Sequence, residues 1–257
     1  MTSETILYHE LYNTLTPRTP FSKGIVVASD LSQEKFLPWW WDNYKAFNDF
    51  PVTFVDLGLS REMKQWCKEK GNYVHLPISG LFVSEQEEMD PAVVKQFERE
   101  SGKYLWGCRS AWFRKPLACL QSPYESSIWM DIDCEIRGSI ESLFSFCTHP
   151  SGMSLAQEYG IHSPPLFNSG VIAFAQNTSL LRLWALKSLK EHTKYPGDQD
   201  VLNAIFHEQK ISPGLLPPYY NWSRFKEENP ESIIVHWHGP HGKRIIEHQM
   251  QRKHSIL

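Results

Sequence analysis

The chain has 257 residues, of which 41% are hydrophobic, enough for one large α/β domain with a substantial core. A net charge of -3 and a pI near 6.4 argue against a general nucleic-acid-binding protein. The five cysteines are odd in number, lack a zinc-ribbon spacing and are expected to be reduced thiols. Without a signal-peptide pattern or a run near the ~20 apolar residues that span a bilayer, we expect a soluble cytoplasmic protein.

In the first third of the chain, apolar runs alternate with amphipathic segments. Residues 1–22 are polar, with two prolines, and are interpreted as an irregular lead-in or a short helix. Strands are expected at 24–30, 51–56 and 72–76, and helices at 37–47 and 60–70. The order β-α-β-α-β predicts a mainly parallel sheet covered by helices.

The rest of the chain continues this alternation. The sequence predicts helices at 91–100, 104–120, 180–192 and 197–207, with an interruption of the second at Pro116. Strands are expected at 128–130, 154–157, 166–174 and 232–236, and a turn with a short helix at 138–146. Gly170 falls inside one of these strands, where glycine often marks the close approach of a ligand or another backbone.

An acid pair follows the central apolar strand. Asp131 and Asp133 are two residues apart, so on an extended chain both carboxylates face the same side. Such a pair requires a cation between the two groups, a shared proton, or full solvation. Taken alone, Asp-x-Asp leaves a divalent-metal site and a solvated acid pair both open.

Four apolar runs end in groups that suit a polar ligand: Asp30, the pair Asp131 and Asp133, Asn168, and His236. In open α/β sheets, ligands bind beyond the carboxyl ends of the strands. We therefore expect these groups along one edge of the sheet, forming the floor of a crevice. His236 would complete a ligand set for Mn²⁺, with Mg²⁺ as the alternative.

Two further segments carry charge whose role the sequence leaves open. Lys243 follows two glycines after His236 and suits a diphosphate, or belongs to a basic tail with Arg244, Arg252 and Lys253. That tail suits a plain surface helix or peripheral contact with the inner face of an anionic membrane. The run 198–200 is either an acid-rich helix start, favoured by the helix dipole, or a grip on sugar hydroxyls.

Five segments, in this order, resemble the nucleotide-sugar glycosyltransferases of GT-A fold, specifically the retaining family 8 type: 27–30, 129–133, 167–171, 198–203, and 236–239 with Lys243. The resemblance implies a single Rossmann-like α/β domain over 1–257 with a mainly parallel central sheet flanked by helices. Residues 24–140 would form the nucleotide-binding half, 141–243 the donor-sugar and acceptor half, and 244–257 a basic tail.

The resemblance also implies a role for each matching residue. Ala28 and Asp30 would lie against the uracil and ribose, and Arg114 would contact the nucleotide-sugar. The metal would be held by Asp131, Asp133 and His236, and the diphosphate by Gly239 and Lys243. The donor sugar would be held by Asn168, Asp198 and Gln199, with Asp200 beside them. One departure is that Lys243 comes four residues after Gly239, where the family has three, and Arg-Ile follows in place of Pro-Trp.

The activity implied is transfer of a hexose from a UDP-sugar to a hydroxyl of a carbohydrate or glycoconjugate acceptor, with retention of anomeric configuration. Gln199 or Asp200 would stabilise the sugar cation. A metal-dependent phosphohydrolase is the first alternative, although its acid pair usually follows the first strand, with Thr or Val where Glu135 stands here. A non-catalytic nucleotide-sugar- or carbohydrate-binding protein is the second. The aromatic segment 219–222 is a candidate acceptor platform or a loop packed on the core.

Overall fold

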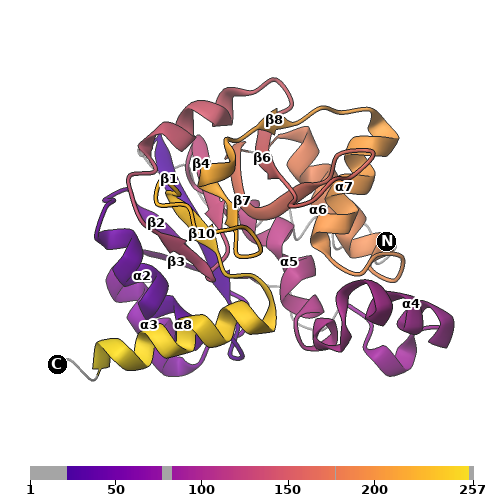
Figure 1. Cartoon of the computed structure of the whole chain (residues 1–257), viewed down its shortest axis with the longest axis horizontal. Helices are drawn as coiled ribbons and strands as arrows, with labels where there is room; N and C mark the ends of the chain where they lie inside the picture. Colours follow the sequence, from indigo (N-terminus) through magenta and orange to yellow (C-terminus); the bar gives the residue numbers. More distant parts are fainter. Residues whose placement is uncertain (1–21, 77–82, 177, 255–257) are drawn as a thin grey trace.

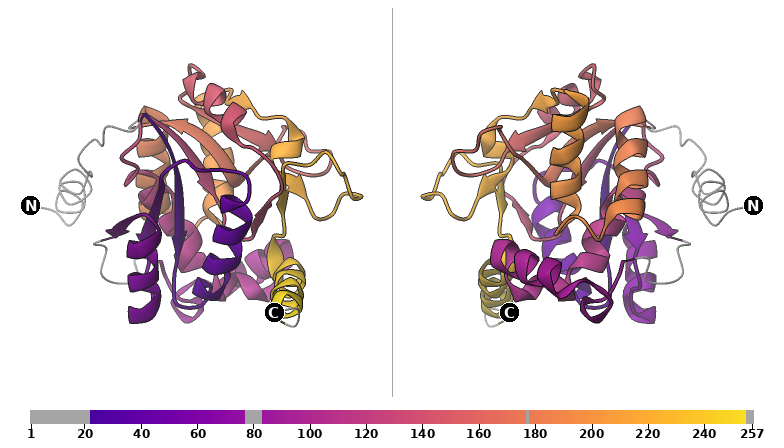
Figure 2. Two further views of the ribbon diagram at one scale, coloured as in Figure 1. Left: turned by 90° about the vertical axis from the view of Figure 1, so that its left-hand side faces the viewer. Right: turned by 90° about the vertical axis from the view of Figure 1, so that its right-hand side faces the viewer.

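A seven-stranded sheet in the order β3-β2-β1-β4-β7-β6-β8 forms the centre of the molecule, with helices on both faces (Figures 1 and 2). The computed structural model describes residues 22–76, 83–176 and 178–254, so the segment before residue 22 lies outside the described residues. The strands of this sheet are β1 (Lys23–Ser29), β2 (Val52–Asp56), β3 (Asn72–His75), β4 (Ser126–Met130), β6 (Met153–Gln157), β7 (Phe167–Ala175) and β8 (Gly214–Leu215).

The central sheet contains both parallel and antiparallel strands, so the polar groups at one edge do not all stand at the carboxyl ends of strands. Strands β3, β2, β1 and β4 are parallel, but β7 runs antiparallel to both β4 and β6. Asn168 stands near the start of β7, not at its carboxyl end as expected. Because β7 is reversed, its start lies beside the end of β4, where the Asp131 amide donates to the Gly170 carbonyl at 2.8 Å.

A second, three-stranded sheet corrects the expected position of His236. It consists of β5 (Cys134–Ile136), β10 (Ile234–His236) and β9 (Trp222–Ser223), in the order β5-β10-β9. The predicted strand at 232–236 therefore does not belong to the central sheet. β10 pairs with β5 so that His236 stands opposite Cys134, and the Trp237 amide donates to the Asp133 carbonyl at 2.9 Å. This pairing brings His236 to the acid pair from a distant part of the sequence.

The helices form two layers around the central sheet. Helices α2, α3 and α8 pack on one face together with the small sheet, and α5, α6 and α7 pack on the other. Helix α4 lies apart from the sheet, below α6 and α7 in Figure 1. The α-helices are α2 (Leu37–Lys45), α3 (Arg61–Lys70), α4 (Pro91–Ser101), α5 (Arg109–Cys119), α6 (Ser179–Glu191), α7 (Asp198–Gln209) and α8 (Gly239–His254). Short 3₁₀ helices are η1 (Glu34–Phe36), η2 (Gln86–Glu88), η3 (Lys103–Gly107), η4 (Glu141–Thr148) and η5 (Pro218–Tyr220).

Both faces of the sheet are apolar, and successive residues of each strand point to opposite faces. In β1, Ile25 and Val27 belong to the cluster under α2, whereas Val26 belongs to the cluster under α5 and α6. Trp39 and Trp40 are buried in the first cluster, as expected for core aromatics. A strand buried on both faces reads as the continuous apolar run that the sequence shows.

Two local predictions need correction. Helix α5 continues through Pro116 without interruption, because Pro116 is buried with Leu117 and Ala118 and this packing offsets the hydrogen bond that proline cannot donate. Helix α8 begins at Gly239, ahead of the basic tail predicted at 244–257, so the glycine-rich segment after His236 is the first part of this helix. Ile246 and Met250 of α8 pack on the core, which favours the surface-helix interpretation of the basic tail.

The remaining global expectations concern thiols and membranes. All five cysteines have free thiols, as the sequence predicts. Within the described ranges, the structure contains no helix of the length and apolarity needed to cross a bilayer.

Candidate active site

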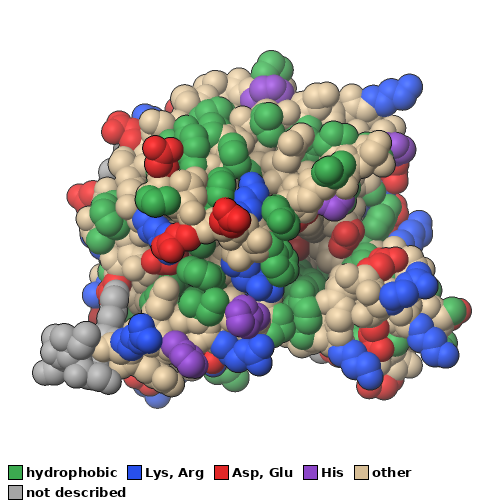
Figure 3. Space-filling model, in the orientation of Figure 1, with side chains coloured by type: hydrophobic (Ala, Val, Ile, Leu, Met, Phe, Trp, Pro, Cys, Tyr) green, Lys and Arg blue, Asp and Glu red, His purple; other side chains and the backbone are tan. Residues whose placement is uncertain are grey.

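Two connected cavities lie at the sheet edge formed by the end of β4 and the start of β7. The narrower one is bordered by Ala28 and Asp30 at the end of β1. The wider one, of about 600 Å³, extends towards the start of α7. Their shared wall includes Lys115, Asp131 and Asp133. Figure 3 shows a hollow on this face of the molecule, between the lobe containing α4 and the segments above it, with acidic side chains on its walls.

Of the residues predicted to hold the nucleotide, Ala28 and Asp30 border the narrower cavity, and Arg114 does not. Asp30 Oδ1 accepts hydrogen bonds from the Ser32 amide at 3.0 Å and the Ser32 hydroxyl at 2.7 Å. Arg114 lies behind Asp30, with Nη2 3.8 Å from Asp30 Oδ2 and Nη1 donating to the Leu57 carbonyl. Arg114 therefore braces the loops after β1 and β2 instead of bordering the cavity itself.

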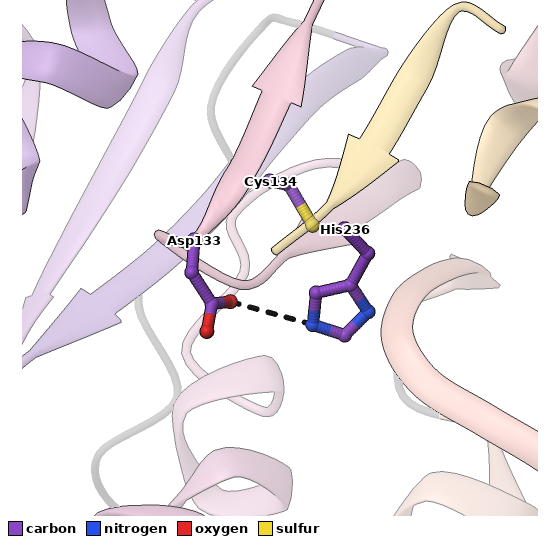
Figure 4. Close-up of side chains that lie close together, drawn as sticks. All are labelled: Asp133, Cys134 and His236. Carbon is purple, nitrogen blue, oxygen red and sulfur yellow. Dashed lines mark ion pairs between the residues drawn. The ribbon is translucent and has the colours of Figure 1, made fainter. Parts of the chain in front are cut away.

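The three predicted metal ligands converge. His236 Nε2 lies 3.3 Å from Asp133 Oδ1 and 3.7 Å from Asp131 Oδ2. Figure 4 shows the Asp133 carboxylate and the His236 ring pointing toward one another. Two ligand atoms each about 2.1 Å from one ion, at right angles, are about 3 Å apart. The distance of His236 from each aspartate suits ligands of one divalent ion, but the side chains whose ligand atoms all lie within 4.8 Å of one another are Asp133, Cys134 and His236, without Asp131.

A hydrogen-bond chain fixes the orientation of the His236 ring. Asn221 Nδ2 donates to Asn168 Oδ1 at 2.9 Å, and Asn168 Oδ1 also accepts from the Gly170 amide at 2.9 Å. This leaves Asn221 Oδ1, 3.1 Å from His236 Nδ1, as an acceptor. His236 Nδ1 then carries the proton, so the lone pair of Nε2 faces the two aspartates, as a metal ligand requires.

Cys134 is close to this cluster, with its sulfur within 4.8 Å of ligand atoms of Asp133 and His236. Its Sγ donates to the Gly170 carbonyl at 3.8 Å. In the metal-free site, burial raises the pKa of the Cys134 thiol well above its usual value. The predicted set of two carboxylates and one imidazole suits Mn²⁺ or Mg²⁺, whereas the group Asp133, Cys134 and His236 adds a sulfur atom, which suits a softer ion.

Two lysines neutralise the acid pair. Lys243 Nζ lies 2.8 Å from Asp133 Oδ2, and Lys115 Nζ lies 3.0 Å from Asp131 Oδ1. Burial acts to raise the pKa of Asp133, but Lys243 and His236 outweigh it and hold that pKa well below its usual range. Lys243 borders both cavities, yet its direct partner is a predicted metal ligand and not an open phosphate position. Lys115 was not predicted as a site residue.

The predicted donor-sugar residues line the wider cavity together. Asn168 Nδ2 and Gln199 Nε2 both donate to Glu158 Oε2, at 2.8 and 2.9 Å. Asp198 Oδ2 accepts from the Ser169 hydroxyl at 2.9 Å, and burial raises the pKa of Asp198. Glu158, which the sequence did not single out, therefore orients two predicted site residues at once.

Asp200 caps the start of α7 and also borders the wider cavity. Its Oδ2 accepts from the Gly197 amide at 3.0 Å, which caps α7. The side chain is open to the cleft and borders the wider cavity. Loss of hydration among the surrounding groups, together with the negative charge of the neighbouring Asp198, raises the pKa of Asp200 to about 6.

A buried arginine holds the segment that leads into α7. The Arg109 guanidinium donates to the carbonyls of His192, Tyr195 and Pro196, at 2.5, 3.2 and 3.1 Å. Arg109 is 1% exposed, and burial lowers its pKa to about 10, so it stays charged at neutral pH. This contact anchors the turn before Asp198 to α5.

The aromatic segment 219–222 does not form the wall of either described cavity. Tyr220 and Asn221 are buried, and Tyr220 packs against Tyr219 with ring centroids 4.7 Å apart. Phe225 borders the wider cavity instead, with 56% of its surface exposed. Its ring stacks on Tyr159 at a centroid distance of 6.2 Å. The loop after β9, and not the predicted segment, brings aromatic surface to the cleft.

This sheet order, with the acid pair at its edge, is the fold of the GT-A glycosyltransferases. The structure is similar to the apo-form glycosyltransferase GlyE of Streptococcus pneumoniae TIGR4 (TM-score 0.56, 15% identity), over 88% of this chain and 55% of that one. It is also similar to the galactosyltransferase LgtC in complex with donor and acceptor sugar analogues (TM-score 0.53, 13% identity), over 87% of this chain and 94% of that one. A third similar structure is mouse xyloside xylosyltransferase 1 (TM-score 0.52, 16% identity), over 84% of this chain and 97% of that one.

At these identities the likeness establishes the fold alone, and this chain spans only about half the length of GlyE. The sequence matches no protein-family model, and no curated protein matches it.

Proposed function

We propose that this protein is a metal-dependent, retaining glycosyltransferase of family 8 type, which moves a hexose from a UDP-sugar to an acceptor hydroxyl. The observation that carries the proposal is the convergence of Asp131, Asp133 and His236 at the edge of a GT-A sheet. Two cavities meet there, one on the side of Ala28 and Asp30, the other on the side of α7.

In this proposal Asp131, Asp133 and His236 hold Mn²⁺ or Mg²⁺. When bound, the divalent ion stabilises the negative charge that grows on the departing diphosphate. Lys243, at the wall shared by the cavities, adds a positive charge there, and Gly239 at the start of α8 leaves room for the phosphates. The uracil and ribose lie in the narrower cavity against Ala28 and Asp30, which Arg114 braces.

The donor sugar occupies the wider cavity, gripped by Asn168, Asp198 and Gln199. Glu158 fixes the amide groups of Asn168 and Gln199, so the carbonyl oxygen of Gln199 is already oriented before the donor arrives. A positioned dipole stabilises a developing sugar cation without reorganisation. Gln199, with Asp200 beside it, fills that role, and the leaving phosphate takes the acceptor's proton on the same face.

For the acceptor, we assign the exposed pair Phe225 and Tyr159 at the rim of the wider cavity. Pyranose rings stack their C–H faces on aromatic side chains, and Phe225, on which Tyr159 stacks, borders the cavity proposed for the donor sugar. Arg224 and Lys226 lie over the rings of Phe225 and Tyr159, at 4.1 and 6.0 Å from the centroids. These charges add hydrogen-bond donors for hydroxyl or carboxyl groups of a carbohydrate or glycoconjugate.

The phosphohydrolase alternative finds less support in the geometry. Glu135, which stands where such enzymes usually have Thr or Val, turns away to accept from Trp237 Nε1 at 2.8 Å and Arg137 Nη2 at 3.0 Å. Incubation with a panel of UDP-sugars and Mn²⁺ separates the candidates. Slow release of UDP supports the transferase, release of inorganic phosphate supports the hydrolase, and binding without turnover supports a non-catalytic binding protein. The Asp131→Ala variant should abolish UDP release, and full activity in that variant would refute the metal role.

A further inference from the structure

Lys115 is a buried cation in the middle of the candidate site. It lies on α5 and is 5% exposed. Its ammonium group is 3.0 Å from Asp131 Oδ1, 3.3 Å from Asp198 Oδ2 and 3.1 Å from the Ser169 hydroxyl. A buried ammonium group is tolerated only where acceptors surround it, and here all of its protons have oxygen partners.

The partners of Lys115 come from separate segments with separate proposed roles. Asp131 follows β4 and belongs to the proposed metal ligands, whereas Asp198 opens α7 and belongs to the proposed donor-sugar residues. Without Lys115, these two carboxylates would face one another across the same buried space. The Lys115 ammonium group lies within 3.3 Å of both carboxylates, which favour its charged form.

The charges around the site do not cancel. Three carboxylates, of Asp131, Asp133 and Asp198, face the two ammonium groups of Lys115 and Lys243. The acidic side chains therefore outnumber the ammonium groups by one. The positive charges of Lys115 and Lys243 therefore weaken the electrostatic attraction between the acids and a divalent ion bound here.

We infer that Lys115 is an internal counter-ion of this site, which holds Asp131 and Asp198 together when the metal is absent and thereby limits the affinity for the metal. Lys115 is thus a positioning residue that acts through the two acids. The inference rests on the proposed metal-dependent function.

The test replaces Lys115 by methionine, which keeps the length of the side chain and removes the charge. Melting temperature and Mn²⁺ affinity are measured for the wild type and for Lys115→Met, by thermal unfolding and isothermal titration calorimetry. Lys187→Met is the matched control, because Lys187 also lies between two acids, Glu191 at 3.8 Å and Glu208 at 2.5 Å, on α6 away from the cavities. If Lys115→Met does not fold, Lys115→Gln and the double variant Lys115→Met/Asp198→Asn take its place.

We expect Lys115→Met to melt below the wild type without metal, and to bind Mn²⁺ at least about tenfold more tightly, since a positive charge a few ångströms from the ion has been removed. Added Mn²⁺ should narrow the difference in melting temperature, and Lys187→Met should leave the Mn²⁺ affinity unchanged. Asp198→Asn should cost less stability in the Lys115→Met background than in the wild type. A Lys115→Met protein that binds Mn²⁺ no more tightly than a Mn²⁺-binding wild type overturns this inference and leaves the proposed function intact. A wild type that binds no Mn²⁺ overturns both.

Discussion

Gly170 is the position where one methyl group tests the candidate metal site. A Cβ placed on Gly170 would lie 2.2 Å from His236 Cε1 and 2.4 Å from His236 Nδ1. The φ angle of Gly170 is outside the positive range that disfavours other residues, so the backbone accepts alanine. The effect of Gly170→Ala therefore comes from side-chain contacts, chiefly with the His236 ring and secondly with Asn168 Oδ1, 2.9 Å from the added Cβ.

The size of the effect follows from these distances. Carbon atoms pack at about 3.5 Å or more, so the imidazole must move by more than about 1 Å. His236 is 4% exposed and enclosed, and metal ligands tolerate displacements of only about 0.2 Å. We expect the affinity for Mn²⁺ to fall by about 10–100-fold, as when a ligand loses its support. Overpacking should also lower the free energy of unfolding by about 1–3 kcal/mol.

The assay is a calorimetric Mn²⁺ titration, with urea unfolding to measure stability. Gly138→Ala is the control, because a Cβ at Gly138 meets only Ile233 side-chain atoms at 3.7 and 3.8 Å, which is ordinary contact. Gly138→Ala should bind Mn²⁺ as the wild type does. A Gly170→Ala variant with wild-type affinity for Mn²⁺ would show that His236 is not a ligand, and the reasoning from this geometry would fail.

Four further outcomes are expected. Asp133→Asn should lower UDP release from a UDP-sugar at least about 100-fold, because a charged oxygen facing the metal is lost; release that persists without added metal would contradict this. Phe225→Ala should raise the KM for a carbohydrate acceptor about tenfold, which is a loss of about 1.4 kcal/mol of binding free energy, and should leave donor hydrolysis unchanged. The control is Phe47→Ala, which removes a similarly exposed ring elsewhere and should change neither quantity. If ionised Asp200 supports transfer, the rate should rise as the pH passes about 6, the raised pKa of this group, and Asp200→Asn should remove that inflection. Asp56 is fully buried, and hydrogen bonds from Tyr73 and backbone amides hold its pKa far below the usual range against the effect of burial. Ionised Asp56 therefore stabilises the fold above about pH 4, and this stabilisation is lost as the pH falls. Asp56→Asn should lower the free energy of unfolding in urea by about 2–4 kcal/mol at pH 7 and by less at pH 3, and an equal loss at both pH values would contradict the charge-based account.

Patterns local in sequence predicted most of the fold. Helix α3 has its serine cap at Ser60, whose hydroxyl accepts from the Met63 amide at 3.1 Å, and ends before Gly71. Strands β1, β2 and β3 and helix α4 lie within a residue or two of the predicted bounds. These features depend on contacts between neighbours in the chain, which a sequence displays directly. The predicted interruption at Pro116 was wrong because the hydrogen bond lost at a proline is visible in the sequence, whereas the burial of Pro116 against distant residues, which compensates for it, is not.

The residues of the candidate site were predicted more completely than their partners. Asp131, Asp133 and His236 were expected to meet, and the structure places His236 Nε2 3.3 Å from Asp133 and 3.7 Å from Asp131. Lys115, Glu158 and Asn221 were not expected. A lysine next to Arg114 on a helix, or an acid in a turn, carries no sign of what it will face. Their partners lie 16, 41 and 15 positions away, in Asp131, Gln199 and His236.

The sequence by itself determined most of the strands and helices, and which of them carry acids, amides or imidazoles near their ends, because periodicity and capping act over a few residues. Only the tertiary structure decided that β7 runs backwards and that β10 leaves the central sheet to pair with β5. Those two choices depend on long-range pairing of apolar faces. They place Asn168 and His236 at the acid pair, and they enclose Lys115 between charges that no local pattern connects.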